Sequence, residues 1–249
     1  MFAISRYLWV APHILLLFVV AVLLYRKLHR QVPFFTCYAI FNFVQSAILY
    51  PIALTVPFPK DLYHWTAFVT EIVSVLLTIA VIYELASNVL VLRPSLVHTL
   101  RVVLSISLAI LILAAALSSA TLQSISSRQV MNLLVMVGFF SHLVITGLLL
   151  TLFAFTRVLN IRWPRIPAGI ALGFGIYHPV NFLGAALVSA YGIPSLVPVD
   201  IIDMASFHIA VVLWLVFLLR PGPELKNTNV SLSPADLAIW DVEAQRMVQ

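Results

Sequence analysis

The chain has 249 residues, of which 62% are hydrophobic and 9% are charged. This composition lies far outside the range of soluble globular domains, so it excludes a soluble domain and predicts a protein embedded in the lipid bilayer. The formal net charge of +5 does not indicate a nucleic-acid partner, because the Lys and Arg residues fall between apolar runs and form no block.

Seven apolar windows are long enough to span roughly 30 Å of hydrocarbon at about 1.5 Å per residue. The loops between them are short, so consecutive helices should be antiparallel neighbours in one bundle. We therefore predict an all-α, polytopic membrane protein with a seven-transmembrane-helix bundle over residues 1–220. The predicted spans are Leu8–Tyr25, Phe34–Thr55, Tyr63–Asn88, Leu100–Ser119, Gln129–Phe155, Ile166–Ala190 and Ile201–Leu219.

The distribution of cationic residues predicts the orientation of the bundle. One set of loops contains only Arg6, Lys60 and Arg128. Cytoplasmic loops are the ones enriched in Lys and Arg, so we expect the amino terminus outside, the carboxyl terminus in the cytoplasm, and a multi-pass location in the cell (inner) membrane. The other set of loops holds most of the cationic residues: Arg26, Lys27, Arg30, Arg93, Arg101, Arg157, Arg162, Arg165, Arg220, Lys226 and Arg246.

The last segment, residues 221–249, is predicted to be a cytoplasmic tail with a short amphipathic helix near 234–247. Ser233 and Pro234 supply an N-cap and a proline at the first helical position, and Trp240 lies on a narrow apolar stripe. We expect this acidic helix to fold back onto the basic loop of Arg157, Arg162 and Arg165, and the tail and basic loops to contact a protein partner. The alternative is a tail of weak helicity, because isolated helices this short are marginal.

Several polar side chains fall at one depth inside the predicted bundle. Positions along each span place them roughly 9 to 13 Å below the outer boundary, with Asn181 shallower and His142 and Asn42 nearer the midplane. Polar groups at this depth are costly unless they pack inside protein or line a wet cavity. The residues at the common level are His13, Gln45, Glu71, His178 and His208.

Helical spacing indicates that this layer faces inward. Tyr38, Asn42 and Gln45 recur at i, i+4 and i+7, and a second polar stripe on the next span consists of Glu71, Ser74 and Thr78. On the sixth span, Pro179 cannot donate to the carbonyl of Gly175, which predicts an interruption of that helix. The same span carries small residues that should let another helix approach closely: Gly169, Gly173 and Gly184.

The functional interpretation of this layer is a small, outward-facing ligand pocket. The alternative is interhelical packing, in which the buried polar groups bond to one another and bind no ligand. The residues predicted to line the pocket are Gln45, Glu71, His178, Asn181 and His208.

Three further acidic residues receive structural roles. Glu84 is expected to pair with a loop arginine such as Arg93 near the cytoplasmic end. Asp200 and Asp203 are expected to stabilise the start of the seventh helix, where carboxylates interact favourably with the helix dipole. If water reaches these two aspartates, they could also form a mouth that attracts cations.

The sequence lacks the residue patterns of several known classes of membrane protein that bind a cofactor or a metal. A retinal protein needs a lysine inside a span, and none is predicted there. Haem would need two histidines on different helices, His178 with His208 being the best pair by depth and His142 a third candidate. Zinc hydrolases of seven helices carry paired histidines on one helix, which this seventh span lacks. The single cysteine, Cys37, is expected to be a small buried core residue. We therefore predict no catalytic residue, no metal ligand and no assigned cofactor.

The chain as a whole resembles a bacterial family of seven-helix integral membrane proteins with no assigned function. The resemblance rests on Pro33-Phe34-Phe35 with Tyr38, on Tyr83-Glu84, on the Gly169–Gly175 run, on Leu218-Leu219-Arg220-Pro221 and on the tail around Trp240. It implies the membrane bundle and no substrate.

The leading hypothesis is a non-enzymatic membrane protein, either a sensor-like module that binds a small ligand or an accessory subunit of a membrane complex. The first alternative is a secondary transporter or proton-coupled carrier that uses Glu71 and the histidines. The second is a redox subunit that holds haem or quinone.

Overall fold

The computed structural model describes residues 2–55, 59–90, 94–119, 129–191 and 196–220. These residues form helices joined by short turns, so the predicted all-α class is confirmed. The elements are α1 (Phe2–Tyr25), the 3-10 turn η1 (Leu28–Arg30), α2 (Pro33–Leu54), α3 (Lys60–Val89), α4 (Pro94–Ser119), α5 (Gln129–Val158), α6 (Arg165–Tyr191) and α7 (Leu196–Leu219).

Six helices, α2 to α7, are long and apolar enough to cross a membrane. They indicate a multi-pass membrane protein, because a helix of about 20 apolar residues matches the thickness of the hydrocarbon core. Within the described residues, α1 has a shorter apolar stretch, Val10–Tyr25, which does not reach this length.

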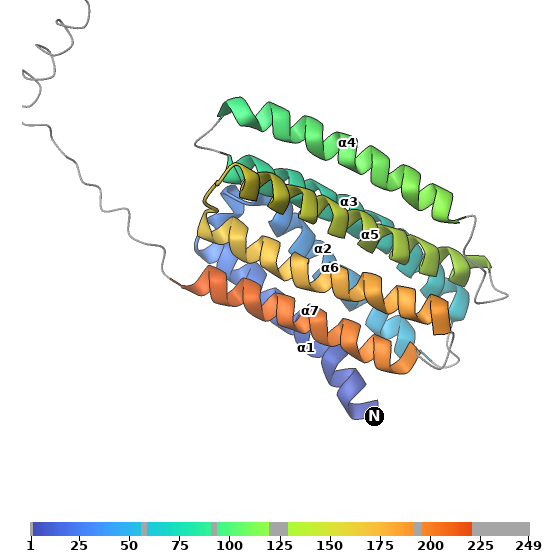
Figure 1. Cartoon of the computed structure of the whole chain (residues 1–249). Helices are drawn as coiled ribbons and strands as arrows, with labels where there is room; N and C mark the ends of the chain where they lie inside the picture. Colours follow the sequence, from blue (N-terminus) through green and yellow to red (C-terminus); the bar gives the residue numbers. More distant parts are fainter. Residues whose placement is uncertain (1, 56–58, 91–93, 120–128, 192–195, 221–249) are drawn as a thin grey trace, which may run out of the picture. The chain divides into compact units, whose positions relative to one another are not determined.

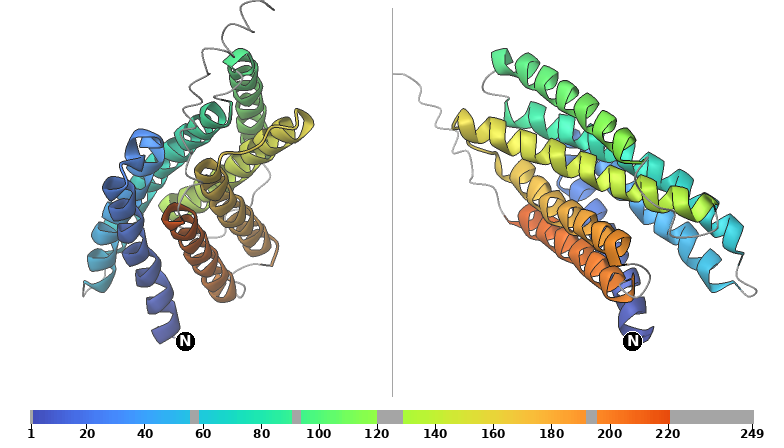
Figure 2. Two further views of the ribbon diagram at one scale, coloured as in Figure 1. Left: turned by 90° about the vertical axis from the view of Figure 1, so that its left-hand side faces the viewer. Right: turned by 45° about the vertical axis from the view of Figure 1, so that its right-hand side comes forward.

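The helices of residues 1–219 run alongside one another (Figure 1). α1, α2, α3, α5, α6 and α7 surround the interior, whereas α4 lies at one edge and contacts only α3 and α5 within the described part of the chain. Both views in Figure 2 show α4 in this peripheral position. α4 is therefore the helix with least influence on the interior.

Glycines on α6 allow α7 to pack closely against it. A Cβ atom added at Gly173 would lie 2.1 Å from Nε1 of Trp214, and one added at Gly169 would lie 2.3 Å from Cγ of Phe217. At Gly184 the nearest atom would be Cγ1 of Val199, at 2.8 Å. The predicted close approach at these glycines is confirmed, because no side chain would fit between the helices there.

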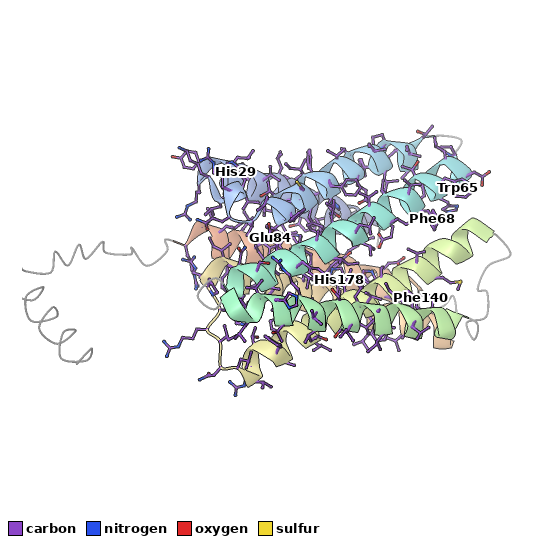
Figure 3. The ribbon with its side chains drawn as sticks, turned by 90° about the horizontal axis from the view of Figure 1, so that it is seen from above. His29, Trp65, Phe68, Glu84, Phe140 and His178 are labelled. Atoms are coloured by element: carbon purple, nitrogen blue, oxygen red, sulfur yellow. The ribbon has the colours of Figure 1, made fainter. Side chains whose placement is uncertain are left out.

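Arginine side chains hold the end of the bundle at which α7 finishes. The guanidinium of Arg26 donates to the carbonyl oxygen of Leu218, and Nη2 of Arg165 donates to that of Phe217 at 2.7 Å. The last carbonyls of a helix have no partner within it, and cations there also interact favourably with the helix dipole. We call this the basic end of the bundle; His29 and Glu84 lie towards it in Figure 3, and Trp65 lies towards the opposite end.

At the same end, Glu84 of α3 caps the amino terminus of α2. Its two carboxylate oxygens accept hydrogen bonds from the backbone N–H groups of Phe34 and Phe35, each at 3.0 Å. The predicted partner, Arg93, lies outside the described residues. The expected pairing with an arginine such as Arg93 therefore stays a prediction, and the described contacts of Glu84 form a helix cap.

Three other expectations are corrected by the helix bounds and burial. α6 continues as an unbroken α-helix through Pro179, so the predicted interruption is wrong. Cys37 is exposed on the surface of α2 and is not a core residue. α7 begins at Leu196, so neither Asp200 nor Asp203 lies in its first turn, where they were expected to interact with the helix dipole. The predicted tail helix near 234–247 lies outside the described residues.

Candidate functional site

A cavity of about 270 Å³ lies between the helices, and we call it the polar cavity. Liquid water takes about 30 Å³ per molecule, so this volume suits a ligand of a few heavy atoms. All helices except α4 contribute to its wall. The lining residues are Pro12, His13, Tyr38, Asn42, Gln45, Ser46, Leu49, Tyr63, Glu71, Ser74, Val75, Thr78, His142, Ile145, Tyr177, His178, Asn181, Asp203, Met204 and Phe207.

The two polar stripes predicted on α2 and α3 both face the polar cavity. Asn42 donates from Nδ2 to the carbonyl oxygen of Tyr38, one turn earlier on α2, at 2.9 Å. Glu71 lies opposite α5, where the hydroxyl of Ser141 approaches Oε1 at 3.5 Å. This distance is at the limit of a hydrogen bond, so the carboxylate of Glu71 is weakly satisfied.

A pair of histidines joins α5 to α6 in the wall of the cavity. Nδ1 of His142 lies 2.9 Å from Nδ1 of His178, and the ring centroids are 5.1 Å apart. One nitrogen must donate and the other accept, so a single hydrogen is shared along this contact. His178 is 4% exposed, and its Nε2 has no hydrogen-bond partner in the described structure. Figure 3 places His178 midway along the helices.

α6 and α7 add an amide and a second carboxylate. Asn181 donates from Nδ2 to the carbonyl oxygen of Tyr177 at 2.9 Å and approaches the hydroxyl of Ser206 at 3.4 Å. Oδ1 of Asp203 is buried and has no hydrogen-bond partner within the described ranges. The Asp203 carboxylate packs against the bare backbone of Gly184, where an added Cβ would lie 3.0 Å from Oδ1.

Four aromatic side chains close the polar cavity towards the basic end, and we call them the aromatic floor. Phe174 contacts Tyr38 and Trp214 with centroid distances of 5.0 and 5.1 Å, and Phe35 contacts Trp214 at 5.1 Å. All four are at most 2% exposed. Edge-to-face packing of this kind is stable and dense, so we expect this layer to hinder the passage of water.

Four of the five predicted pocket residues line one cavity: Gln45, Glu71, His178 and Asn181. His208 does not belong to the described lining, so the structure does not bring it together with the other four. Its ring lies beside Tyr7 of α1, with centroids 6.1 Å apart. The reason is the helical turn of about 100° per residue, which points His208 away from the face on which Phe207 lines the cavity.

The structure adds lining residues that were not predicted for the pocket. His13 had the expected depth, but no face on α1 could be assigned to it. His142 was placed too near the midplane to be grouped with His178. Asp203 was missed because the start of α7 was predicted five residues too late, at Ile201. A polar residue two turns inside an apolar helix would have been the available signal.

The histidines are arranged differently from the haem pair predicted by depth. The Nδ1 atoms of His142 and His178 lie 2.9 Å apart, which is closer than the separation of about 4 Å between two axial ligands at roughly 2 Å from one iron. His208, the other half of the best predicted haem pair, faces elsewhere. Across the residues that are described, no three His, Cys, Asp or Glu side chains group as a metal site.

Fold and cavity together define the class: a helical, multi-pass membrane protein with a polar cavity enclosed by six of its helices. Comparison with models of protein families, with curated proteins and with solved structures finds no match for this chain. The resemblance to the bacterial seven-helix family therefore stays a prediction.

The histidine pair supplies a test of how much the wall contributes to stability. Replacing His142 by Leu should lower the free energy of unfolding by about 1 to 3 kcal/mol, because it leaves a buried His178 without its Nδ1 partner. The double variant with His178→Leu should cost less than the sum of the two single changes. Reversible unfolding of the detergent-solubilised protein measures this cycle, and purely additive losses would show that the two rings do not interact.

Proposed function

We propose that the chain is a seven-span protein of the cell membrane, with α1 as the first span, the amino terminus outside and the carboxyl terminus in the cytoplasm. The positions of the cationic side chains support this orientation. Arg26, Arg157 and Arg165 all lie at the basic end, together with η1. With the basic end in the cytoplasm, the polar cavity would lie on the outer side of the aromatic floor.

We further propose that the protein is non-enzymatic and binds a small polar molecule in the polar cavity. The observation that carries this proposal is a cavity lined by carboxylate, imidazole and amide groups from several helices, with buried polar atoms left unpaired. Nε2 of His178 and Oδ1 of Asp203 are two such atoms. A ligand that bonds to them would remove the cost of burying them unsatisfied.

Few of the polar side chains in the cavity wall form the bonds between helices that the packing interpretation requires. The amide of Asn42 bonds to the backbone of its own helix, and that of Asn181 does so at its shorter contact. One hydrogen of each amide nitrogen is thus bonded within its own helix, and that bond does not join two helices. The described polar contacts that cross between helices in the cavity wall include the histidine pair and two longer contacts at Ser141 and Ser206.

Such a protein would act as a sensor-like module or as an accessory subunit of a membrane complex. Any signal would have to pass to a protein partner, which we propose contacts the cytoplasmic tail and the basic loops. A secondary or proton-coupled carrier is the second candidate. The aromatic floor favours it, because alternating access requires a cavity that is closed towards one side of the membrane at a time.

Cysteine accessibility tests the proposed cavity. Native Cys37 is exposed, so it is first replaced by Ala. Ser46→Cys then places a thiol in the cavity wall, and Ala47→Cys places one on the exposed face of α2 at nearly the same depth. A charged, membrane-impermeant methanethiosulfonate added outside intact cells should modify the first thiol and not the second, because hydrocarbon excludes the reagent.

Addition of the same reagent to inside-out vesicles should leave both thiols unmodified, because the aromatic floor blocks access. If neither thiol is modified from either side of the membrane, the result would contradict a water-filled cavity. Modification of the thiol at position 46 from the cytoplasmic side alone would contradict the proposed orientation.

A further inference from the structure

The charged groups that face the polar cavity have one sign. α3 contributes Glu71 and α7 contributes Asp203, while α1, α5 and α6 contribute the histidines His13, His142 and His178. No Lys or Arg is found among the described side chains that line it. An anionic ligand would therefore meet two carboxylates and no permanent cation, which makes the cavity a poor site for it.

Neither carboxylate has a cationic partner among the described residues that line the cavity. Glu71 has the hydroxyl of Ser141 at 3.5 Å, and Asp203 has a buried oxygen without any hydrogen bond. A carboxylate in a low-dielectric interior is costly unless a cation or several donors compensate for it. A bound cation that also donates hydrogen bonds would supply that compensation.

Aromatic faces complete the wall and distinguish an organic cation from a metal ion. The rings of Tyr38, Tyr63, Tyr177 and Phe207 all line the cavity. Aromatic faces attract alkylammonium groups through the ring quadrupole, whereas divalent metals need several oxygen ligands at short range. Tyr177 lines the same cavity as Glu71 and Asp203, so the two carboxylates and this aromatic ring share one site.

We propose that the ligand of the polar cavity is a small organic ammonium ion, held by Glu71 and Asp203 and surrounded by aromatic rings. This inference rests on the proposed function and specifies the chemical class of its ligand. The cavity volume of about 270 Å³ limits the ion to a short amine or a small quaternary ammonium. The unpaired Nε2 of His178, buried in the same wall, provides a further contact for a polar substituent of the ligand.

Charge selectivity of thiol modification tests this inference in the Cys37→Ala, Ser46→Cys protein. The modification rates of the cationic trimethylammonioethyl and the anionic sulfonatoethyl methanethiosulfonate are compared. Each rate is divided by the rate at which the same reagent modifies a small free thiol in solution, which corrects for intrinsic reactivity. The cationic reagent should react roughly tenfold faster or more, as expected for a cleft lined by one sign of charge. Glu71→Gln and Asp203→Asn should each reduce this preference severalfold without abolishing modification.

The outcomes separate this inference from the function on which it rests. A thiol at position 46 that no reagent reaches contradicts the water-filled cavity itself. A thiol that both reagents reach at equal normalised rates leaves the cavity intact and overturns the cation preference. Glu71→Gln and Asp203→Asn are made as separate variants, so that the test remains possible if one of them does not fold. Size-exclusion chromatography shows which variants are folded.

Protection experiments then probe the ligand class directly. Tetramethylammonium and methylammonium chloride should slow modification of the thiol by neutral N-ethylmaleimide, and Glu71→Gln should weaken that protection severalfold. The uncharged tert-butyl alcohol and sodium methanesulfonate, at matched ionic strength, should protect little. Equal protection by the uncharged alcohol, or protection unaffected by both acidic variants, would overturn the proposal.

Discussion

Replacing Gly173 by Ala is expected to lower the free energy of unfolding by about 3 kcal/mol, at the upper end of overpacking costs in protein cores. The added Cβ would lie 2.1 Å from Nε1 of Trp214, a separation no folded structure tolerates. Trp214 cannot move away easily, because it is fully buried and its indole donates to the carbonyl oxygen of Ile170 at 3.2 Å. α6 and α7 must therefore separate, or the aromatic floor must repack.

Gly175→Ala is the matched control on the same helix. Its Cβ would lie 3.6 Å from Cε2 of Phe153, an ordinary van der Waals distance. We expect this variant to unfold within about 1 kcal/mol of the parent protein, the size of the difference in helix propensity. Thermal and denaturant unfolding in one detergent measure both variants. Similar losses at the two positions would show that α6 does not pack against Trp214 as described.

A second change should restore part of the loss at Gly173. Trp214→Leu removes the colliding indole. The double variant with Gly173→Ala should therefore lose less free energy of unfolding than the sum of the losses in the two single variants. Residues in direct contact show such coupling, whereas distant residues do not. A coupling energy near zero would place the cause of the Gly173 effect elsewhere.

The cavity faces of α2 and α3 could be read from the sequence because their polar residues repeat at helical spacing. Gln45 and Glu71 each have polar neighbours one and two turns away, which fixes the rotation of the helix. α7 carries a polar stripe as well, with Asp200, Asp203 and Ser206 at i, i+3 and i+6. His208 lies off that stripe, and only its depth groups it with the pocket.

Burial is hard to predict in this chain because lipid and the protein interior favour the same side chains. Cys37 lies in an apolar run that looks the same whether it faces a helix or the bilayer, and the structure places it on the surface. Close packing was more predictable at Gly173, because glycine in a spanning helix indicates a neighbouring backbone or ring.

The cap formed by Glu84 could not be predicted from its sequence. Its partners are the backbone N–H groups of Phe34 and Phe35, about 50 positions away, and backbone groups carry no residue signature. Local reasoning instead assigned the carboxylate to a nearby arginine. In the folded chain, helix ends meet only when the bundle is assembled, so this contact is a property of the tertiary structure.

Loss of the Glu84 side chain should be about as damaging as the change at Gly173. Val32, the residue that precedes α2, forms no side-chain cap, and Pro33 has no N–H group. The next two N–H groups therefore depend on Glu84, which is 9% exposed. Glu84→Ala would leave both without partners, at a cost of about 2 to 4 kcal/mol for hydrogen bonds to a charged group. Glu84→Gln keeps one acceptor and should cost roughly half as much.

Asn88→Ala provides the control one turn further along α3. Asn88 donates to the carbonyl oxygen of Gln31 at 3.0 Å in an exposed position, so its loss should cost under about 1 kcal/mol. The cap also affects the cavity, because the first turns of α2 carry Phe35 and Tyr38 of the aromatic floor. Glu84→Ala should therefore allow a cytoplasmic reagent to reach a thiol introduced at position 46, whereas Asn88→Ala should not. Equal accessibility in the two variants would show that the α2 cap does not hold the floor in place.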